Sequence, residues 1–105
     1  MTSVIHKRPQ ALLDLACQAE FIARDSSAAA ERLVAAANAT FIQLCEFPEL
    51  GTAIVSDDPR LTDLRFRAIK GFRYHLVVYR ATSDGIDVVR VLHAARNWAT
   101  ILDES

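Results

Sequence analysis

The sequence predicts an α+β fold with the element order β-α-α-β-β-β, in which an antiparallel sheet packs on a helical hairpin and a short C-terminal helix follows. Two apolar stripes at helical spacing flank the residues Asp25-Ser26-Ser27 and predict the two helices. Residues 64–93 read as three consecutive short strands joined by tight turns, which only antiparallel pairing can use. The chain has 105 residues, 51% of them hydrophobic. We therefore expect one domain, residues 1–105, around a single core.

In the N-terminal half, residues 2–8 alternate weakly and predict an edge strand. Pro9 suits the first position of a helix, where its missing N–H costs nothing. Asp25-Ser26-Ser27 breaks this helix and offers caps for the second. The second helix is expected to end at Phe47-Pro48, because the residue before a proline disfavours the helical region. The stripes are Leu12, Leu15/Ala16, Ala19 and Ile22/Ala23 in the first helix, and Ala30, Leu33/Val34, Ala37, Phe41 and Leu44 in the second.

Residues 48–63 predict an irregular connection, with turn residues at Gly51 and at 57–59. In the strand that follows, residues 64, 66 and 68 are apolar and alternate with Arg65 and Arg67, so one face should pack inward while the other presents guanidinium groups. Residues 74–80 are apolar on both faces, as in a central strand. Ser83-Asp84-Gly85 predicts a hairpin turn into a last strand at 86–93. A short helix at about 96–102 would cover part of the sheet.

The charges divide the chain into two parts. Residues 64–96 contain seven lysines and arginines and two acids, whereas residues 10–63 contain nine acids and three arginines. The net charge of −1 therefore combines a basic sheet with an acidic helical half. Such a division indicates a surface for an anionic partner.

Several classes of protein do not fit the sequence. Apolar runs of a few residues are too short for a membrane helix, which needs about 20. The first residues lack the apolar core of a signal peptide, so we expect a cytoplasmic protein. Three scattered histidines give no metal-binding spacing, and we expect no metal and no cofactor. Helical-hairpin geometry separates Cys17 and Cys45 by roughly 15 Å along the helices, more than a disulfide spans, and both are interpreted as small buried hydrophobic residues.

Three segments in their order and spacing resemble the toxins of the RelE/ParE superfamily of bacterial type II toxin–antitoxin systems, most closely the ParE branch. They are Phe47-Pro-Glu-Leu-Gly51, Gly71-Phe-Arg-Tyr-His-Leu-Val-Val-Tyr-Arg80 and Val88-Val-Arg-Val-Leu-His-Ala-Ala-Arg96. The resemblance covers nearly the whole chain. It implies a protein that slows growth when free and is held silent by an acidic, partly disordered antitoxin of the ParD or RelB type.

The superfamily divides on mechanism. The ParE branch implies inhibition of DNA gyrase through protein contact, without chemistry by the toxin, and this is the interpretation we favour. The surface that would bind the target or the antitoxin is basic. We expect it to comprise Arg65, Arg67, Lys70, Arg73, Arg90, Arg96 and Trp98.

RelE-like members cleave mRNA in the ribosome. The alternative to gyrase inhibition is therefore an endoribonuclease, and this is the enzyme activity that we consider. The residues that would act are Arg65, Arg67, His93 and Arg96. An arginine cannot serve as a base, so His93 is the only candidate proton carrier at that end of the chain. A third possibility is a protein with this fold that is not toxic and only binds a partner.

Structural interpretations stand beside the functional ones. Arg65 and Arg67 could form the solvated face of an outer strand, and His93 could be a packed histidine at a strand end. His75 alternates with Val77 and Tyr79 and is interpreted as structural.

Overall fold

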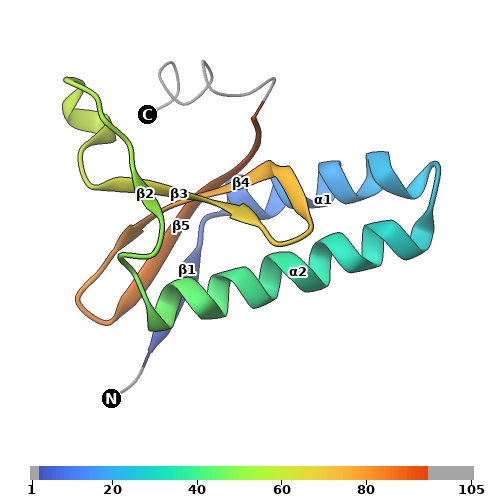
Figure 1. Ribbon diagram of the computed structural model, residues 1–105, viewed down its shortest axis with the longest axis horizontal. Helices are drawn as coiled ribbons and strands as arrows, with labels where there is room; N and C mark the ends of the chain where they lie inside the picture. The colour runs from blue at the N-terminus through green and yellow to red at the C-terminus, as the bar shows by residue number, and fades with distance from the viewer. Residues whose placement is uncertain (1–2, 95–105) are drawn as a thin grey trace.

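The computed structural model describes residues 3–94. Two helices pack against one face of a five-stranded sheet (Figure 1). The helices are α1 (Pro9–Ala23) and α2 (Ser27–Glu46), and a short 3₁₀ helix covers Pro59–Leu61. The strands are β1 (Val4–Lys7), β2 (Thr52–Ala53), β3 (Leu64–Ile69), β4 (Phe72–Ala81) and β5 (Gly85–His93). The expected α+β order of elements is confirmed. The helix expected at 96–102 lies outside the described residues.

The sheet is mixed, with the strand order β1-β5-β4-β3-β2. The pairs β3–β4 and β4–β5 are antiparallel, as the short turns predicted. β1 occupies an edge, as expected, but it runs parallel to β5. The antiparallel pairing expected among residues 64–93 is confirmed, and β1 makes the sheet mixed because it is far from β5 in sequence and no tight turn dictates its direction. The connection at 48–63 contains β2 and the 3₁₀ helix, which were not predicted.

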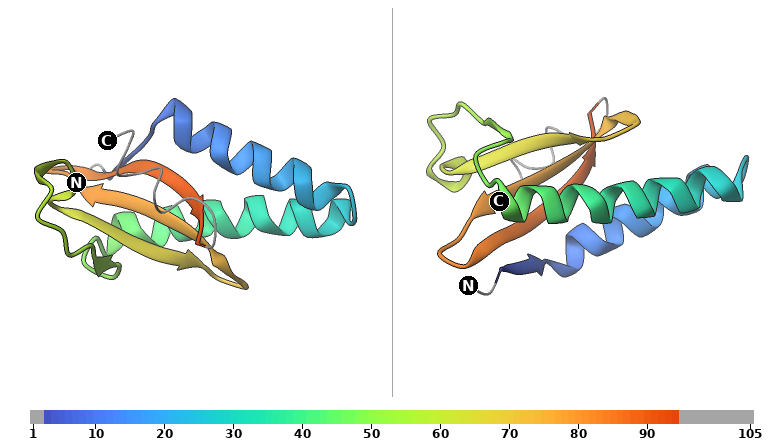
Figure 2. Two further views of the ribbon diagram at one scale, coloured as in Figure 1. Left: turned by 90° about the horizontal axis from the view of Figure 1, so that it is seen from above. Right: turned by 60° about the horizontal axis from the view of Figure 1, so that its bottom comes forward.

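The helical hairpin begins and ends where the sequence indicated. Pro9 occupies the first turn of α1, and the Ser26 hydroxyl caps α2 by accepting a hydrogen bond from the Ala29 amide at 3.1 Å. α2 ends before Pro48. The two helices extend past the sheet, so their connecting turn lies away from the strands (Figure 2).

Both faces of the sheet carry apolar clusters. The larger cluster joins the helices to the sheet and includes Leu33, Phe41, Val77 and Tyr79. The second lies on the opposite face, where Leu64, Val78 and Leu92 pack with Leu61 of the 3₁₀ helix. β3 was expected to pack its even-numbered positions inward; Leu64 and Phe66 do so in the second cluster, whereas Ala68 is exposed.

Tyr79 fixes the connection that leaves α2. Its hydroxyl is buried under the chain, donates to the Pro48 carbonyl at 2.6 Å and accepts from the Gly51 amide at 2.9 Å. Burial raises the pKa of this phenol, which keeps the donor protonated. A Cβ at Gly51 would lie 2.4 Å from the hydroxyl oxygen, so only glycine fits. This contact explains why the Phe-Pro-Glu-Leu-Gly segment at 47–51 ends in glycine.

Asp14 and Gln18 attach α1 to the edge of β5 beyond the end of β1. The Asp14 carboxylate accepts from the Val91 amide at 3.1 Å, and the Gln18 side-chain amide donates to the Val91 carbonyl at 2.8 Å. Asp14 also pairs with Arg90 through two hydrogen bonds, of 2.8 and 3.1 Å. A helix thus satisfies backbone groups that would otherwise form an open sheet edge.

The Asp14–Arg90 pair should be a major contribution to stability. The two side chains are only 10% and 11% exposed, and Asp14→Asn would remove the carboxylate that neutralises the buried Arg90 guanidinium. We expect a loss of about 3 kcal/mol in the free energy of unfolding at neutral pH, measured by urea denaturation.

The matched control is Glu20→Gln, an exposed acid on the same helix. It should change the free energy of unfolding by less than about 0.5 kcal/mol. Equal stabilities for the two variants would show that the pair contributes nothing beyond a surface charge.

Candidate functional site

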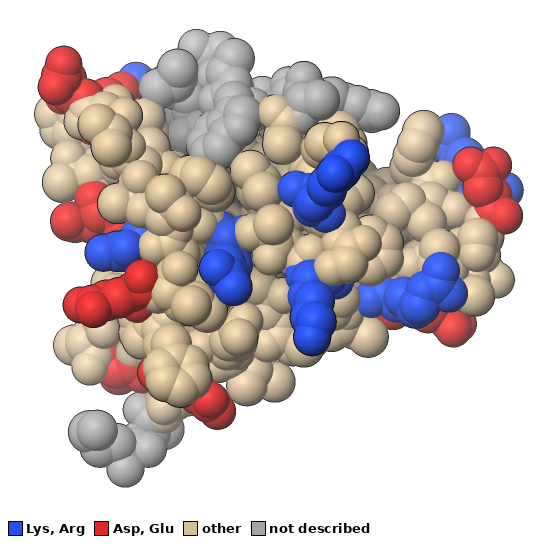
Figure 3. All heavy atoms as spheres, viewed as in Figure 1, with Lys and Arg blue, Asp and Glu red and all other residues tan. Residues whose placement is uncertain are grey.

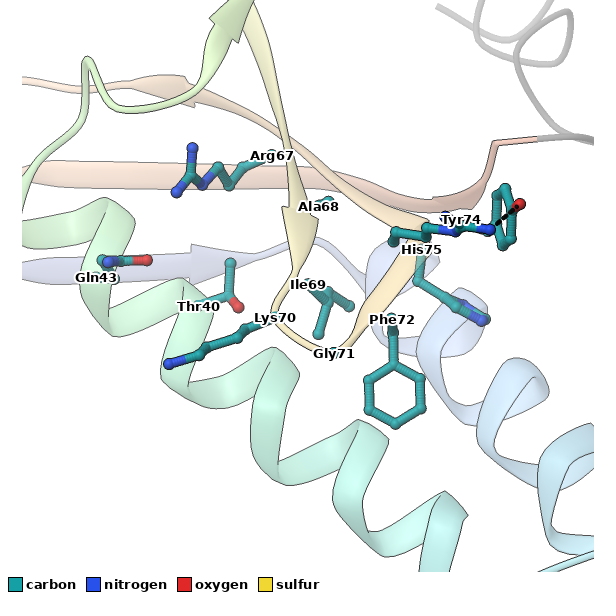
Figure 4. Close-up of a pocket in the computed structure, with 11 residues that line it drawn as sticks. Thr40, Gln43, Arg67, Ala68, Ile69, Lys70, Gly71, Phe72, Tyr74 and His75 are labelled. Atoms are coloured by element: carbon teal, nitrogen blue, oxygen red, sulfur yellow. Dashed lines mark hydrogen bonds between the residues drawn. The ribbon is translucent and has the colours of Figure 1, made fainter.

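A groove of about 930 Å³ lies between α2 and the β3–β4 hairpin. We call it the basic groove. Figure 4 shows its lining side chains, with Thr40 and Gln43 on α2 facing the residues of the hairpin. The lining comprises Thr40, Gln43, Arg67, Ala68, Ile69, Lys70, Gly71, Phe72, Arg73, Tyr74 and His75.

The shape of the hairpin follows from its sequence. The register shifts between Ala68 and Ile69, and Gly71 has φ of +86°, a conformation that favours glycine. Ile69 and Phe72 can therefore both turn toward the helices and pack in the larger cluster. Lys70, between them, stays exposed at the tip of the hairpin.

Three of the expected binding residues, Arg67, Lys70 and Arg73, line the groove and are exposed. Arg73 lies over the Tyr74 ring at 4.8 Å and donates to its hydroxyl at 2.8 Å, which orients the guanidinium. In the space-filling view, basic side chains lie across the middle of this face and acidic ones toward its borders (Figure 3). The groove is therefore suited to an anionic partner.

Arg65 has a different environment from Arg67. It is half-buried, and its guanidinium donates to the Gly51 carbonyl at 2.8 Å and, more weakly, to the Glu49 carbonyl at 3.4 Å. The alternation of β3 places both arginines on the helix side of the sheet, opposite to Leu64 and Phe66. Arg65 thus helps to hold the connection at 47–51, while Arg67 reaches the groove.

Arg90 is covered by α1. It is 9% exposed and is held by Asp14. Its expected place on the surface that would bind a target or antitoxin stays a prediction, although little of the side chain is exposed. A strand of alternating charged and apolar residues does not reveal a helix carboxylate placed over its edge. Arg96 and Trp98 lie outside the described residues.

His75 and His93 face each other across β4 and β5. They are directly paired in the register, and their rings meet edge to face at 5.3 Å. The Gln18 oxygen lies 2.6 Å from His75 Nδ1. Because the Gln18 nitrogen already donates to Val91, this oxygen acts as the acceptor, Nδ1 carries the hydrogen and Nε2 is the basic nitrogen. Burial, and then the charge of His93, lower the pKa of His75.

The chain matches the family model described as ParE toxin of the type II toxin–antitoxin system, parDE, over residues 5–98. The chain belongs to the ParE toxin family. Its members are toxins that pair with an antitoxin. A comparison with curated proteins gave no match.

The geometry of this ParE-family protein separates the residues that a nuclease would combine. In the register, Arg65 pairs with Tyr79 and Arg67 with Val77, whereas His93 pairs with His75 on the far side of β4. His93 is therefore two strands away from the arginines, about 10 Å across the sheet. Arg65 and Arg67 therefore start from a different strand of the sheet than His93.

Several polar residues that complete the groove were not predicted as functional residues from the sequence. His75 was interpreted as structural, and its contact with Gln18 supports that role, yet it also lines the groove. Tyr74 is 51% exposed at the start of a strand whose later positions are buried. Tyr74 and His75 precede the apolar part of this strand, and this pair was the signal in the sequence that could have indicated a functional role. Thr40 and Gln43 lie within a helix and gave none.

Among the described residues, no helix is long and apolar enough to cross a membrane. Residues 3–94 contain no cluster of three or more His, Cys, Asp and Glu side chains that could hold a metal ion. Both cysteines are free; Cys45 is buried as expected, but Cys17 is exposed, so its interpretation as a buried residue was wrong.

The lowered pKa of His75 should make the protein less stable in mild acid. The unfolded chain takes up the proton near the ordinary pKa of 6.5, and the folded protein only at lower pH. Stability should therefore fall as pH drops below about 6.5, until folded His75 is also protonated. Thermal unfolding from pH 7.5 to 5 measures this dependence.

His75→Gln should reduce the slope between pH 6.5 and 5, and NMR titration of the wild-type imidazole should give a midpoint below 6.5. A midpoint at or above 6.5 would show that burial does not govern this histidine.

Proposed function

We propose that this ParE-family toxin arrests growth by binding DNA gyrase through the basic groove, and that its antitoxin silences it by covering the same groove. The observation that supports contact rather than catalysis is the distribution of the polar groups. Exposed cations lie in the groove, while His93 is turned toward His75 and Arg65 is engaged by backbone carbonyls. Oriented arginines and an exposed tyrosine are the residue types that anchor protein interfaces.

The antitoxin part of the proposal follows from charge. Arg67, Lys70 and Arg73 give the groove three exposed cations, and acidic side chains lie toward the borders of this face (Figure 3). An acidic antitoxin segment that orders on binding would find complementary charge here. Ion pairs between the antitoxin and these cations that stay exposed to solvent should make antitoxin binding sensitive to salt.

One observation favours a second function, an endoribonuclease. His75 lines the groove beside the cations, and its Nε2 is the basic nitrogen of a neutral imidazole. A general base among cations is what 2′-hydroxyl activation needs. The experiment must therefore test His75 as well as His93.

Four variants distinguish the two functions: Arg67→Glu, His75→Gln, His93→Gln and the control Arg32→Glu, an exposed arginine of α2 that does not line the groove. A toxin that binds gyrase should tolerate both histidine changes. Arg67→Glu should reduce its affinity for gyrase by about tenfold or more. Arg32→Glu should retain toxicity. Growth arrest is measured on induction, together with linear DNA, the DNA-damage response and mRNA integrity.

The same Arg67→Glu and Arg32→Glu pair tests the antitoxin surface, with binding measured at low and high salt. Only Arg67→Glu should weaken it. Rapid mRNA loss that either histidine substitution abolishes, with a reduction of about 10²–10⁴ in rate, would overturn the gyrase proposal in favour of the nuclease.

A further inference from the structure

A second pocket, of about 430 Å³, lies apart from the basic groove and contains four arginines. We call it the arginine pocket. It combines side chains from α1 and the residue before it, the 3₁₀ helix, β3, β4 and β5. Its lining comprises Arg8, Gln10, Arg60, Leu64, Arg80, Val89 and Arg90. Such a volume lies within the range of about 300–1,000 Å³ that small-molecule sites occupy.

Several pairings bring these residues together. Leu64 pairs with Arg80 between β3 and β4, and Arg80 pairs with Asp87 of β5. Asp87 in turn accepts hydrogen bonds from Arg8, so the register and this contact bring Arg8 and Arg80 to the same part of the sheet. Leu64 and Val89 belong to the second apolar cluster and give the pocket an apolar side.

The charges in the pocket are not balanced. Arg8 pairs with Asp87, Arg60 with Asp58 and Arg90 with Asp14. Arg80 has no ion pair within residues 3–94, and its Nε is shielded from water without any hydrogen-bond partner. A guanidinium whose nitrogen is buried without a partner is costly, and among the described residues Arg80 is the one of the four arginines that has no carboxylate partner.

Two of the neighbouring ion pairs can open at little cost. The Arg8 and Arg60 side chains are 46% and 50% exposed, and exposed ion pairs contribute little to stability. Both guanidiniums could therefore turn to an incoming anion, whereas the buried Arg90–Asp14 pair stays in place. α1 also begins here without a side-chain cap, so the positive end of its dipole lies beside Gln10.

We infer that the arginine pocket is a binding site for a phosphate group. Guanidiniums bind phosphate oxygens through paired hydrogen bonds, and Arg80, whose Nε lacks a hydrogen-bond partner, is the residue that gains most. The phosphate could be free in solution or belong to a nucleic-acid backbone, and the chemistry at the pocket is the same for both. This inference does not depend on the proposed function, because it concerns a different surface and its test does not use toxicity.

The test is an NMR titration of the full-length protein with labelled arginine side chains. Inorganic phosphate is added at constant ionic strength, with sodium chloride as the balancing salt. The Nε–H signal of Arg80 should shift and saturate, and the signal of Arg32, which does not line the pocket, should not. The Arg80 signal is assigned by its loss in Arg80→Gln.

Arg80→Gln should weaken phosphate binding by about tenfold or more, and the matched control Arg32→Gln should leave it unchanged. A second variant, the exposed Arg60→Gln, should weaken binding by a smaller factor and keeps the test open if Arg80→Gln does not fold. Absence of a saturable shift in the wild-type protein, or equal phosphate affinity in Arg80→Gln and wild type, would overturn the inference.

A short DNA duplex replaces inorganic phosphate in a second titration. If the duplex shifts the same arginine signals and inorganic phosphate competes with it, the site takes a backbone phosphate. If inorganic phosphate binds and the duplex does not, the site takes a small phosphate compound.

Discussion

The contact of Asp14 with β5 is the constraint on which the rest of the arrangement depends. One carboxylate neutralises Arg90 and satisfies the Val91 amide, and Gln18, one turn further along α1, satisfies the Val91 carbonyl. These bonds set the position of α1 on the sheet, and α2 follows through the hairpin. The side-chain oxygen of Gln18 orients His75, which lines the basic groove. The contact of α1 with β5 therefore also helps to position a residue of the groove.

A second fixed point lies at the other end of α2. The buried Tyr79 hydroxyl holds Pro48 and Gly51, and Arg65 adds a bond to the Gly51 carbonyl. With both ends of α2 determined, its side chains Thr40 and Gln43 face the β3–β4 hairpin at the groove. The cations of the groove thus lie on the short β3–β4 hairpin, beside a helix whose two ends are held in place. A preorganised contact surface requires such an arrangement.

The sequence predicted the features that depend on local chemistry. Apolar periodicity, Pro9, Ser26 and Pro48 located the helices, and short turns determined the antiparallel pairing. Features that depend on distant pairing were not accessible: the parallel β1, the burial of Arg90 by Asp14 and the role of His75 in the groove. The basic character of the hairpin was predicted, but which cations stay exposed depends on carboxylates and carbonyls that approach from other elements.

The most direct test of the central claim uses purified toxin, gyrase, supercoiled plasmid and ATP. If the toxin acts by contact with the DNA-bound enzyme, linear DNA should accumulate with increasing toxin, and addition of the antitoxin should prevent it. A translation extract without gyrase should keep its mRNA intact under the same concentrations of toxin. Plasmid that is never linearised, together with mRNA that is cleaved in the extract, would contradict the account.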